Sequence, residues 1–367
     1  MGRFSDNRTH YIFPEEGGHH HLDTNHGRLS AQPLESPRGD ERLLWSLHTS
    51  EQYVLWLAAA DEIGLFNILD AAPASAAEVA HTLHIGMVAA EGLLGVLAAL
   101  GFLGQYDGRY SLTQTARDFL LPSSAFYRGA WLEVVRRRPR LTYGMIYTAL
   151  REDGAIYPHY WERSEGEFAQ AGEYVRALHT TSFVGAPALA ERGDFSQVHR
   201  LLDVGGGAGG MSIALALRYP ALRCTVLDHA STCAVAAEYS AAHGVSERVD
   251  TCAADAFADP WPDGYDAILF SNVLNCFNAQ GCQALIQKAY EYLPRGGCLY
   301  IHEMPLYDGK DGPLGIVALS LYDHLGSRGQ QWTAGEVTAM LTNAGFTLAA
   351  MTPTYAYNVL FSAIKPR

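Results

Sequence analysis

The sequence has no apolar run of the roughly 18 residues needed for a membrane-spanning helix. Its first residues also lack the basic and then apolar stretches of a secretory signal peptide. Because 48% of the 367 residues are nevertheless hydrophobic, we expect them to fill cores, and the length suits two domains. The two absences predict a cytoplasmic protein with no membrane partner.

Basic residues are scarce. The 26 lysines and arginines stand against 39 aspartates and glutamates, which gives a formal net charge of -13. A phosphate backbone repels such a surface, so no nucleic acid partner is expected. One basic cluster is present, and we interpret it as a solvated helix end. It consists of Arg136, Arg137, Arg138 and Arg140.

The six cysteines form no CxxC pair, and all of them lie in the C-terminal half. This spacing is typical of neither a disulfide framework nor a zinc site, so we expect buried, reduced thiols and no metal centre. The cysteines are Cys224, Cys233, Cys252, Cys276, Cys282 and Cys298.

The first 40 residues are polar and show no apolar period, which predicts a disordered tail. The tail contains His19, His20, His21 and His26, but flexible histidines without other ligands do not indicate a specific metal site. From residue 41 to about 120, helical periodicity over 43–64, 76–83 and 88–100 precedes two β-like runs around Asp107-Gly108. This order of elements is that of a winged-helix domain.

A winged-helix domain often binds DNA, and its recognition helix then carries Arg, Lys, Asn or Gln. The corresponding helix here has no basic residue and reads MVAAEGLLGVLAALG. We therefore predict a dimerisation module and a homodimer. Residues 121–197 are expected to be helical and rich in aromatic side chains. These either pack helix against helix or form an apolar wall over a substrate pocket.

From residue 198 to 367 strand-like and helix-like segments alternate, beginning with HRLLDV, MSIALALRY and RCTVLD. This alternation predicts an α/β Rossmann-like domain with a mainly parallel sheet. The last two β-rich runs, within residues 346–366, predict a terminal antiparallel pair.

A glycine-rich turn, DVGGGAGG, lies between the first strand and the first helix of this domain. Gly205 and Gly207 allow a close approach of the backbone to a ligand, and the helix start offers free N–H groups. Asp228 closes the next strand, where a carboxylate can bind both hydroxyls of a ribose. Asp255 closes the third strand, and Ala256 and Phe257 after it suit the edge and face of an adenine.

A dinucleotide-binding site is the alternative, because Gly205, Gly207 and Gly210 also fit GxGxxG with an acidic residue near the expected offset. Three features favour S-adenosylmethionine instead. Asp203 precedes the glycines where a ligand ammonium could lie, Asp255 adds a second acidic strand end, and an antiparallel pair replaces further parallel strands.

Residues 43–367 resemble the class I O-methyltransferases with an N-terminal dimerisation domain, which include caffeate, acetylserotonin and antibiotic-pathway enzymes. The matching segments are EIGLFNIL, YSLTQTARDFL, DFSQVHRLLDVGGGAGG, AADAF, LPRGGCLYIHE and WTAGEVTAMLTNAGF. The resemblance implies S-adenosylmethionine as cofactor, a small-molecule acceptor and a homodimer. It also implies cofactor contacts at Gly205, Asp228, Asp255, Ala256 or Phe257, and Ser271.

The sequence departs from the family at the catalytic stretch, which usually reads HVLHDW. Here it reads NVLNCF, so Asn275 replaces the histidine that acts as general base. Glu303 matches one of the two carboxylates that orient that histidine, and Gln331 replaces the other. A general base is typically worth roughly 10² to 10⁴ in rate, whereas positioning can supply about 7 to 11 kcal/mol. Methyl transfer can therefore survive this loss.

Three histidines are candidates for the missing base. We favour His324, in the stretch Tyr322-Asp323-His324 on the helix that usually lines the substrate pocket, over His302 and His179. In a second hypothesis, Asp323 or His324 with Asn275 or His302 would bind iron.

The expected function is methyl transfer from S-adenosylmethionine to a hydroxyl of a small aromatic or natural-product metabolite. The alternatives are C-methylation of an enolisable 2-oxo acid with or without metal, non-methylating chemistry, and a sensor that binds the cofactor.

Overall fold

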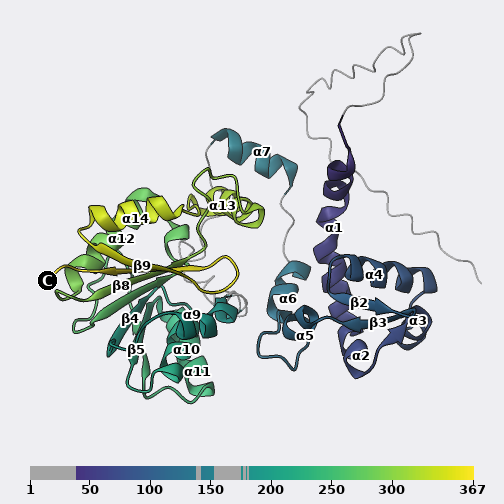
Figure 1. Ribbon diagram of the computed structural model, residues 1–367, viewed down its shortest axis with the longest axis horizontal. Coiled ribbons are helices and arrows are strands. Elements are labelled where there is room, and N and C mark those ends of the chain that lie inside the picture. Colours follow the sequence, from purple (N-terminus) through teal and green to yellow (C-terminus); the bar gives the residue numbers. More distant parts are fainter. Residues whose placement is uncertain (1–38, 138–141, 153–174, 177–178, 180–181) are drawn as a thin grey trace, which may run out of the picture. The chain divides into compact units, whose positions relative to one another are not determined.

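The computed structural model describes residues 39–137, 142–152, 175–176, 179 and 182–367. The predicted tail, with its four histidines, lies outside the described residues apart from Gly39 and Asp40. Figure 1 shows the helices and strands of these residues, coloured along the sequence from the N-terminus to the C-terminus.

The N-terminal part contains a helical unit with a small sheet. Its helices are α1 (Arg42–Glu62), α2 (Leu65–Ala71), α3 (Ala76–Leu83), α4 (Met87–Ala99) and α5 (Gln114–Leu120). The strands β1 (Ala74–Ser75), β2 (Leu103–Tyr106) and β3 (Arg109–Leu112) form a sheet in the order β1-β3-β2. The predicted helices and hairpin are confirmed, whereas α2 and β1 were not predicted.

Local sequence explains the boundaries of two of these elements. Helix α3 starts at a capping box, in which Ser75 and Glu78 each bond the other's backbone N–H. The hairpin between β2 and β3 turns at Asp107 and Gly108, whose φ angles are 48° and 73°. Two-residue hairpin loops favour positive φ at both positions, which asparagine, aspartate and glycine tolerate best.

Among the described residues, no single helix is both long and apolar enough to cross a membrane. The bent pair formed by α3 and α4 passes that test only when the two helices are taken together. Both helices contribute buried residues, such as Val79 and Leu94, to the core of the N-terminal part.

The prediction of a solvated basic cluster is wrong for Arg136. This residue lies on α6 (Gly129–Arg137), and its side chain is only 21% exposed. Its guanidinium forms ion pairs with Asp61 at 2.6 Å and with Glu133 at 2.8 Å, so the carboxylates of α1 and α6 compensate its charge. Arg137 is mostly exposed, and Arg138 and Arg140 lie outside the described residues. Helix α7 (Tyr143–Glu152) follows.

The C-terminal part is built on a seven-stranded sheet in the order β6-β5-β4-β7-β8-β10-β9. The first five strands of that order are parallel, and β10 pairs antiparallel with both β8 and β9. The predicted parallel sheet with a terminal antiparallel pair is confirmed. The strands are β4 (Arg200–Val204), β5 (Arg223–Asp228), β6 (Val249–Ala253), β7 (Ala267–Ser271), β8 (Cys298–Glu303), β9 (Thr347–Pro353) and β10 (Val359–Ile364).

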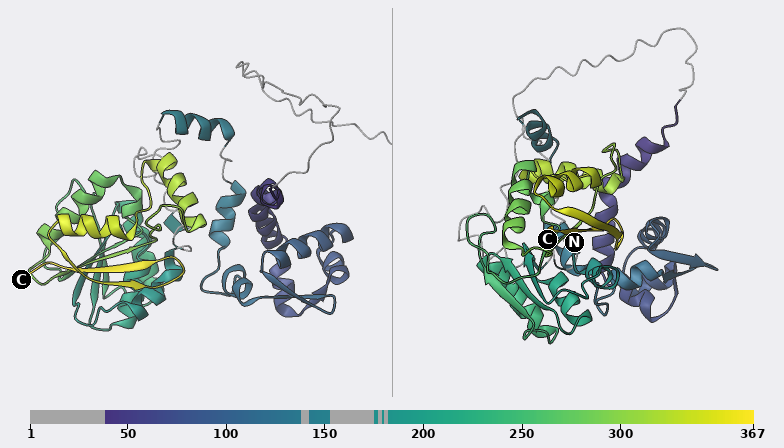
Figure 2. Two further views of the ribbon diagram at one scale, coloured as in Figure 1. Left: turned by 45° about the horizontal axis from the view of Figure 1, so that its top comes forward. Right: turned by 60° about the vertical axis from the view of Figure 1, so that its left-hand side comes forward.

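Helices cover both faces of this sheet, as the views in Figures 1 and 2 show. One face carries η3 (Phe183–Gly185), α9 (Ala186–Arg192), α10 (Gly210–Arg218) and α11 (Ala230–Ala242). The other carries α12 (Ala279–Tyr292) and α14 (Ala334–Asn343), while η4 (Leu274–Cys276) and α13 (Leu314–Ser327) follow β7 and β8.

Alternate strand residues enter two separate cores, because side chains on a strand point to opposite faces in turn. Leu202 packs on the α12 and α14 side, whereas Leu201 packs on the α9 and α10 side. Such two-sided burial is typical of parallel sheets and fixes the carboxyl ends of the strands firmly. All six cysteines are free thiols as predicted, although Cys252, Cys276 and Cys298 are only partly buried.

Candidate active site

The glycine-rich turn lies directly after β4 at the carboxyl edge of the sheet. Gly205, Gly207 and Gly209 all have positive φ, between 58° and 76°, which favours glycine over other residues. A Cβ on Gly205 would also lie 2.9 Å from Val273 Cγ2. The turn therefore requires glycine for both its conformation and its packing, and α10 begins at Gly210 with free N–H groups.

Asp203 is fully buried at the end of β4, below the turn. Its Oδ2 accepts a hydrogen bond of 2.6 Å from Ser212, while Oδ1 has no hydrogen-bond partner among the described residues. Burial raises the pKa of Asp203 to about 6. A buried carboxylate oxygen without a partner beside a glycine turn fits the ammonium of a cofactor, as the sequence predicts.

Asp228, at the end of β5, holds the glycine turn in place. Its Oδ2 accepts from the Gly207 N–H at 3.0 Å, and its Oδ1 accepts from the His229 N–H at 2.7 Å. Burial raises the pKa of this carboxyl. Each carboxylate oxygen has a second lone pair, so both can also accept from a ribose hydroxyl.

Asp255 lies two residues beyond β6, which ends at Ala253 rather than at Asp255 as predicted. Its Oδ1 accepts from the N–H groups of Phe257 at 2.7 Å and Ala258 at 3.0 Å, and these bonds lower its pKa. The Phe257 ring is 42% exposed and meets Phe277 edge-on at 4.9 Å. An exposed ring on a fixed turn suits an adenine face.

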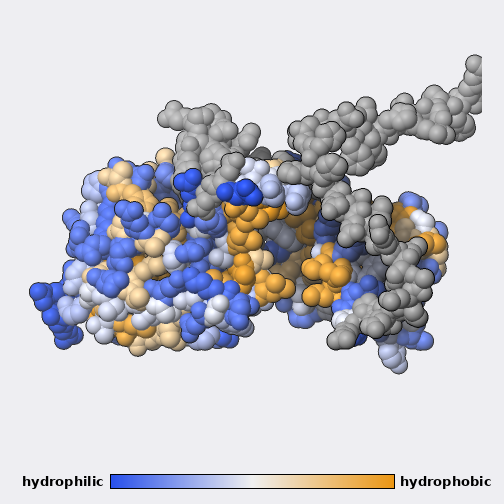
Figure 3. Space-filling view, turned by 90° about the horizontal axis from the view of Figure 1, so that it is seen from above, coloured by the Kyte–Doolittle hydropathy of each residue, from blue (hydrophilic) through white to orange (hydrophobic). Residues whose placement is uncertain are grey.

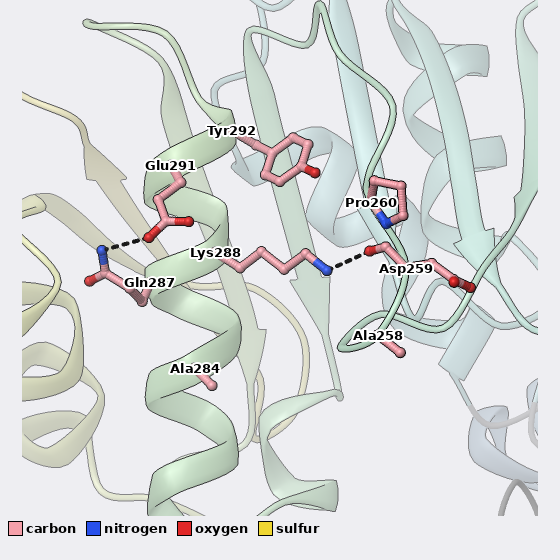
Figure 4. Close-up of a pocket in the computed structure, with 8 residues that line it drawn as sticks. All are labelled: Ala258, Asp259, Pro260, Ala284, Gln287, Lys288, Glu291 and Tyr292. Atoms are coloured by element: carbon pink, nitrogen blue, oxygen red, sulfur yellow. Dashed lines mark hydrogen bonds between the residues drawn. The ribbon is translucent and has the colours of Figure 1, made fainter.

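Lys288 on α12 binds the backbone of this turn. Its ammonium donates to the carbonyl oxygens of Ala256 at 2.9 Å and Asp259 at 2.6 Å and lies 5.0 Å from the Trp261 ring centroid. Figure 4 shows Lys288 reaching across the open groove between α12 and residues 258–260. Because the lysine spans this groove to hold the backbone, we interpret the groove as structural. Sequence reasoning missed Lys288, because only the fold brings it to the turn.

Ser271 and His302 are paired across β7 and β8. The Ser271 Oγ lies 3.0 Å from His302 Nδ1, and His302 Nε2 lies 2.8 Å from Thr354 Oγ1. His302 is fully buried, and burial lowers its pKa to about 4. Since both ring nitrogens are already hydrogen-bonded, His302 suits a neutral structural role better than that of a base.

His179 is also buried. Its ring stacks on Tyr239 at 4.1 Å and on Phe183 at 4.9 Å between ring centroids. Burial lowers its pKa to about 4. The histidine therefore belongs to an aromatic stack beside the start of α10, where a Cβ on Gly210 would lie 3.3 Å from its ring.

The turn η4 carries Asn275, and Glu303 at the end of β8 fixes this turn. Glu303 Oε1 accepts from the N–H groups of both Val273 and Leu274 at 2.8 Å. Burial raises the pKa of Glu303 to about 8, so this carboxyl is largely protonated at neutral pH. The glutamate that the resemblance would assign to orienting a histidine here binds the backbone around an amide.

Asp323 on α13 binds two amides. Its Oδ2 accepts from Asn275 Nδ2 at 3.3 Å and from Gln331 Nε2 at 3.0 Å. Sequence reasoning named Asp323 only as a possible iron ligand and preferred its neighbour His324 as base. Asn275 donates its hydrogen bond to Asp323. Because successive residues of a helix point about 100° apart, the side chain of His324 points in another direction. The catalytic role of His324 stays a prediction.

Among the residues that the structure describes, no group of three or more His, Cys, Asp or Glu is arranged to hold a metal ion.

Known proteins share both parts of this architecture. Residues 54–122 match the O-methyltransferase dimerisation domain, and residues 145–347 match the O-methyltransferase domain. The 3-hydroxy-5-methyl-1-naphthoate 3-O-methyltransferase of Streptomyces sahachiroi is 38% identical over 83% of this chain and 88% of that protein. The L-tyrosine C(3)-methyltransferase of Streptomyces lavendulae is 27% identical over 85% of this chain and 88% of that protein.

Solved structures agree with these matches. Human N-acetylserotonin methyltransferase in complex with S-adenosylmethionine has a TM-score of 0.74 and 25% identity, and the match covers 91% of this chain and 100% of that chain. The sheet, the glycine turn and the acidic strand ends define a Rossmann-like enzyme that binds a nucleoside cofactor. The chain belongs to the O-methyltransferase family with an N-terminal dimerisation domain. It is an enzyme, and its methyl donor is S-adenosylmethionine.

The raised pKa of Glu303 makes stability depend on pH. Between its usual value of 4.5 and about 8, the folded protein holds a proton that the unfolded chain has lost. Stability therefore falls as pH rises through this window. Glu303→Gln keeps an acceptor oxygen for Val273 and Leu274 but removes the charge. We expect Glu303→Gln to unfold at a higher temperature than wild type at about pH 9. The difference in the free energy of unfolding should be on the order of a few kcal/mol.

Thermal unfolding at a series of pH values measures this effect. Glu291→Gln, on the exposed side of α12, is the matched control and should follow wild type. Parallel curves for wild type and Glu303→Gln at every pH would show that the Glu303 carboxyl does not hold a proton in the folded protein.

Proposed function

We propose that the enzyme methylates a phenolic hydroxyl of a hydroxylated aromatic carboxylic acid of the hydroxynaphthoate type. The observation that carries this proposal is the 38% identity with a naphthoate 3-O-methyltransferase over most of both chains. C-methylation of a 2-oxo acid, the alternative from the sequence, is not favoured by these relatives. A metal has no role in the proposed reaction.

S-adenosylmethionine supplies a methyl group on a positively charged sulfur, which is electrophilic. The residues of the chain would bind and orient the reactants. Asp228 and Asp255, with Ala256 and Phe257, would hold the nucleoside, and Asp203 the ammonium. Asn275 would hydrogen-bond the acceptor hydroxyl, because an amide both donates and accepts. Such positioning is typically worth about 7 to 11 kcal/mol of the barrier.

An acceptor panel tests this proposal. Purified protein, S-adenosylmethionine and either 3-hydroxy-1-naphthoic acid, a monocyclic hydroxybenzoic acid, L-tyrosine or a 2-oxo acid are incubated with and without chelator. We expect a product one methylene heavier from the hydroxynaphthoic acid, equal release of S-adenosylhomocysteine, and no effect of chelation. A product from the 2-oxo acid alone, lost on chelation, would contradict the proposal. Methylation of the tyrosine ring would show that the enzyme transfers the methyl group to carbon instead of oxygen.

The chain is further proposed to act as a homodimer through residues 43–120. The dimerisation-domain match and exposed apolar side chains on α4, Met87 at 43% and Val88 at 83%, support this. Apolar surface appears in patches in the space-filling view (Figure 3), and such patches commonly mark interfaces.

Two charges at this surface should weaken the dimer. Light scattering at micromolar concentration should give twice the chain mass for wild type and a smaller average mass for Met87→Glu/Val88→Glu. Glu91→Gln on the same helix is the control. A monomeric wild-type protein would refute the dimer, and an unchanged mass for the double variant would place the interface elsewhere.

A further inference from the structure

Three polar side chains from three separate segments meet where the family has its catalytic histidine. We name them the amide–carboxylate cluster: Asn275 from η4, Asp323 from α13 and Gln331 from the loop before α14. Both amides donate to the same carboxylate oxygen. Two amides thus stand where the family resemblance implies a histidine and one carboxylate, and the Asp323 carboxylate accepts a hydrogen bond from each of them.

The surrounding contacts fix this cluster in place. Gln331 N–H donates to Ser320 Oγ at 3.0 Å, and Trp332 Nε1 donates to the Leu274 carbonyl at 3.0 Å. A Cβ on Gly329 would collide with the Asn275 backbone, so glycine allows this close approach. The loop, α13 and η4 are therefore joined by contacts that hold the three side chains together.

The other ionisable groups around Asn275 are poor proton acceptors. Glu303 Oε1 already binds two backbone N–H groups, and burial keeps that carboxyl largely protonated near neutral pH. Burial raises the pKa of the Cys276 thiol. Both nitrogens of His302 are occupied. His324 follows Asp323 on α13 and is the remaining rival. Burial also raises the pKa of Asp323, which makes its carboxylate a stronger base for accepting the proton of a phenol.

We propose that Asp323 is the general base that accepts the phenolic proton, in the place of the family's histidine. This inference rests on the proposed function, since only a phenol that still carries its proton needs a base. Asp323 lies one hydrogen bond from Asn275, so an acceptor hydroxyl bound by Asn275 has a carboxylate within reach.

The phenolic oxygen forms a bond to the methyl carbon while its O–H bond breaks, and the proton passes to a carboxylate oxygen of Asp323. The electron pair of the broken S–CH₃ bond stays on sulfur and leaves S-adenosylhomocysteine. The Asp323 carboxylic acid then returns the proton to water. No oxidant, reductant or metal is required.

Gln331 can hydrogen-bond Asp323 both when its carboxyl is ionised and when it is protonated. Its Oε1 is buried and has no hydrogen-bond partner among the described residues. While Asp323 is ionised, the Gln331 amide donates to it. Once Asp323 is protonated, a rotated amide presents Oε1 as an acceptor for the new O–H. The unpaired Oε1 would therefore gain a hydrogen bond after proton transfer. An amide with a purely structural role would not need such an unpaired acceptor.

The test compares acceptors of different acidity. Asp323→Asn keeps the shape of the side chain but cannot accept a proton. For 3-hydroxy-1-naphthoic acid, we expect kcat/KM to fall about 10²- to 10⁴-fold. For a nitro-substituted analogue that is already ionised, the fall should be less than about tenfold. Asp250→Asn, an exposed carboxylate-to-amide change on β6, is the control and should match wild type.

A rescue variant separates loss of a base from loss of structure. In Asn275→His/Asp323→Asn, an imidazole replaces the carboxylate, and part of the lost turnover should return. Thermal unfolding adds a readout that does not depend on turnover. Because burial disfavours the Asp323 charge, Asp323→Asn should unfold at the same temperature as wild type or higher at about pH 8.

Each outcome decides between the proposals. If wild type methylates the naphthoic acid and Asp323→Asn is equally active, Asp323 is not the base and the proposed function stands. If His324→Ala alone removes turnover, His324 is the base. If wild type methylates no hydroxynaphthoic acid but methylates another phenol, the acceptor class is wrong, and that phenol then tests Asp323. If it methylates no phenol, both proposals are overturned.

Discussion

Replacing Asp228 with alanine should weaken the binding of S-adenosylmethionine about tenfold or more. The carboxylate accepts a hydrogen bond from Gly207 N–H at 3.0 Å and, in the proposed function, would also accept from the ribose hydroxyls. Losing a hydrogen-bond partner in a buried site typically costs about 1–3 kcal/mol, and each 1.4 kcal/mol is about a factor of ten in affinity.

Isothermal calorimetry of wild type and variant measures this loss. Asp228→Asn keeps one acceptor oxygen, so it should fall between wild type and alanine and should stay folded if Asp228→Ala does not. Asp250→Ala, on the neighbouring strand β6 but away from the carboxyl ends, is the control. Unchanged affinity in folded Asp228→Ala would contradict the assignment of the cofactor site.

Replacing Asn275 with alanine should lower kcat/KM for a phenolic acceptor about tenfold or more. The change removes one donor to the Asp323 carboxylate and, in the proposed function, the group that orients the acceptor. A hydrogen bond to a charged group is typically worth about 1.5–3 kcal/mol. Because the Asn275 donor lowers the pKa of Asp323, its loss should also move the acidic limb of the rate profile to higher pH.

Steady-state kinetics over a range of pH measures both effects. Gln280→Ala, an exposed amide on α12, is the control and should leave the profile unchanged. Cofactor affinity should also be unchanged in Asn275→Ala, because the proposed nucleoside ligands, Asp228 and Asp255, lie at the end of β5 and just beyond β6 and not in η4. Full activity over the whole pH range would show that Asn275 neither orients the acceptor nor influences the base.

The elements with a clear period could be predicted from the sequence. Strands such as β5 (Arg223–Asp228) and helices such as α3 have strong local patterns, and Asp107-Gly108 marks its turn directly. The short strand β1 was missed, since two residues carry no period. The domain boundaries near residues 40, 120 and 197 stay predictions.

The grouping of the proposed cofactor residues could be predicted from the sequence more readily than that of the amide–carboxylate cluster. Gly205 and Asp255 follow β4 and β6, Asp228 is the last residue of β5, and the carboxyl ends of parallel strands meet at one edge of a sheet. Asn275 and Asp323, in contrast, are 48 positions apart, and no local pattern indicates that their side chains meet. The sequence singled out residues 322–324 on α13 as candidates, and the choice between Asp323 and His324 depends on which helix face meets η4.

One single-turnover experiment tests the central claim that this site transfers a methyl group to oxygen without a histidine at position 275. Purified enzyme is mixed with carbon-13-methyl-labelled S-adenosylmethionine and 3-hydroxy-1-naphthoic acid, and the product is followed by NMR. We expect one labelled methyl ether for each S-adenosylhomocysteine formed. A labelled methyl on ring carbon, or S-adenosylhomocysteine formed without any methylated acceptor, would contradict that claim.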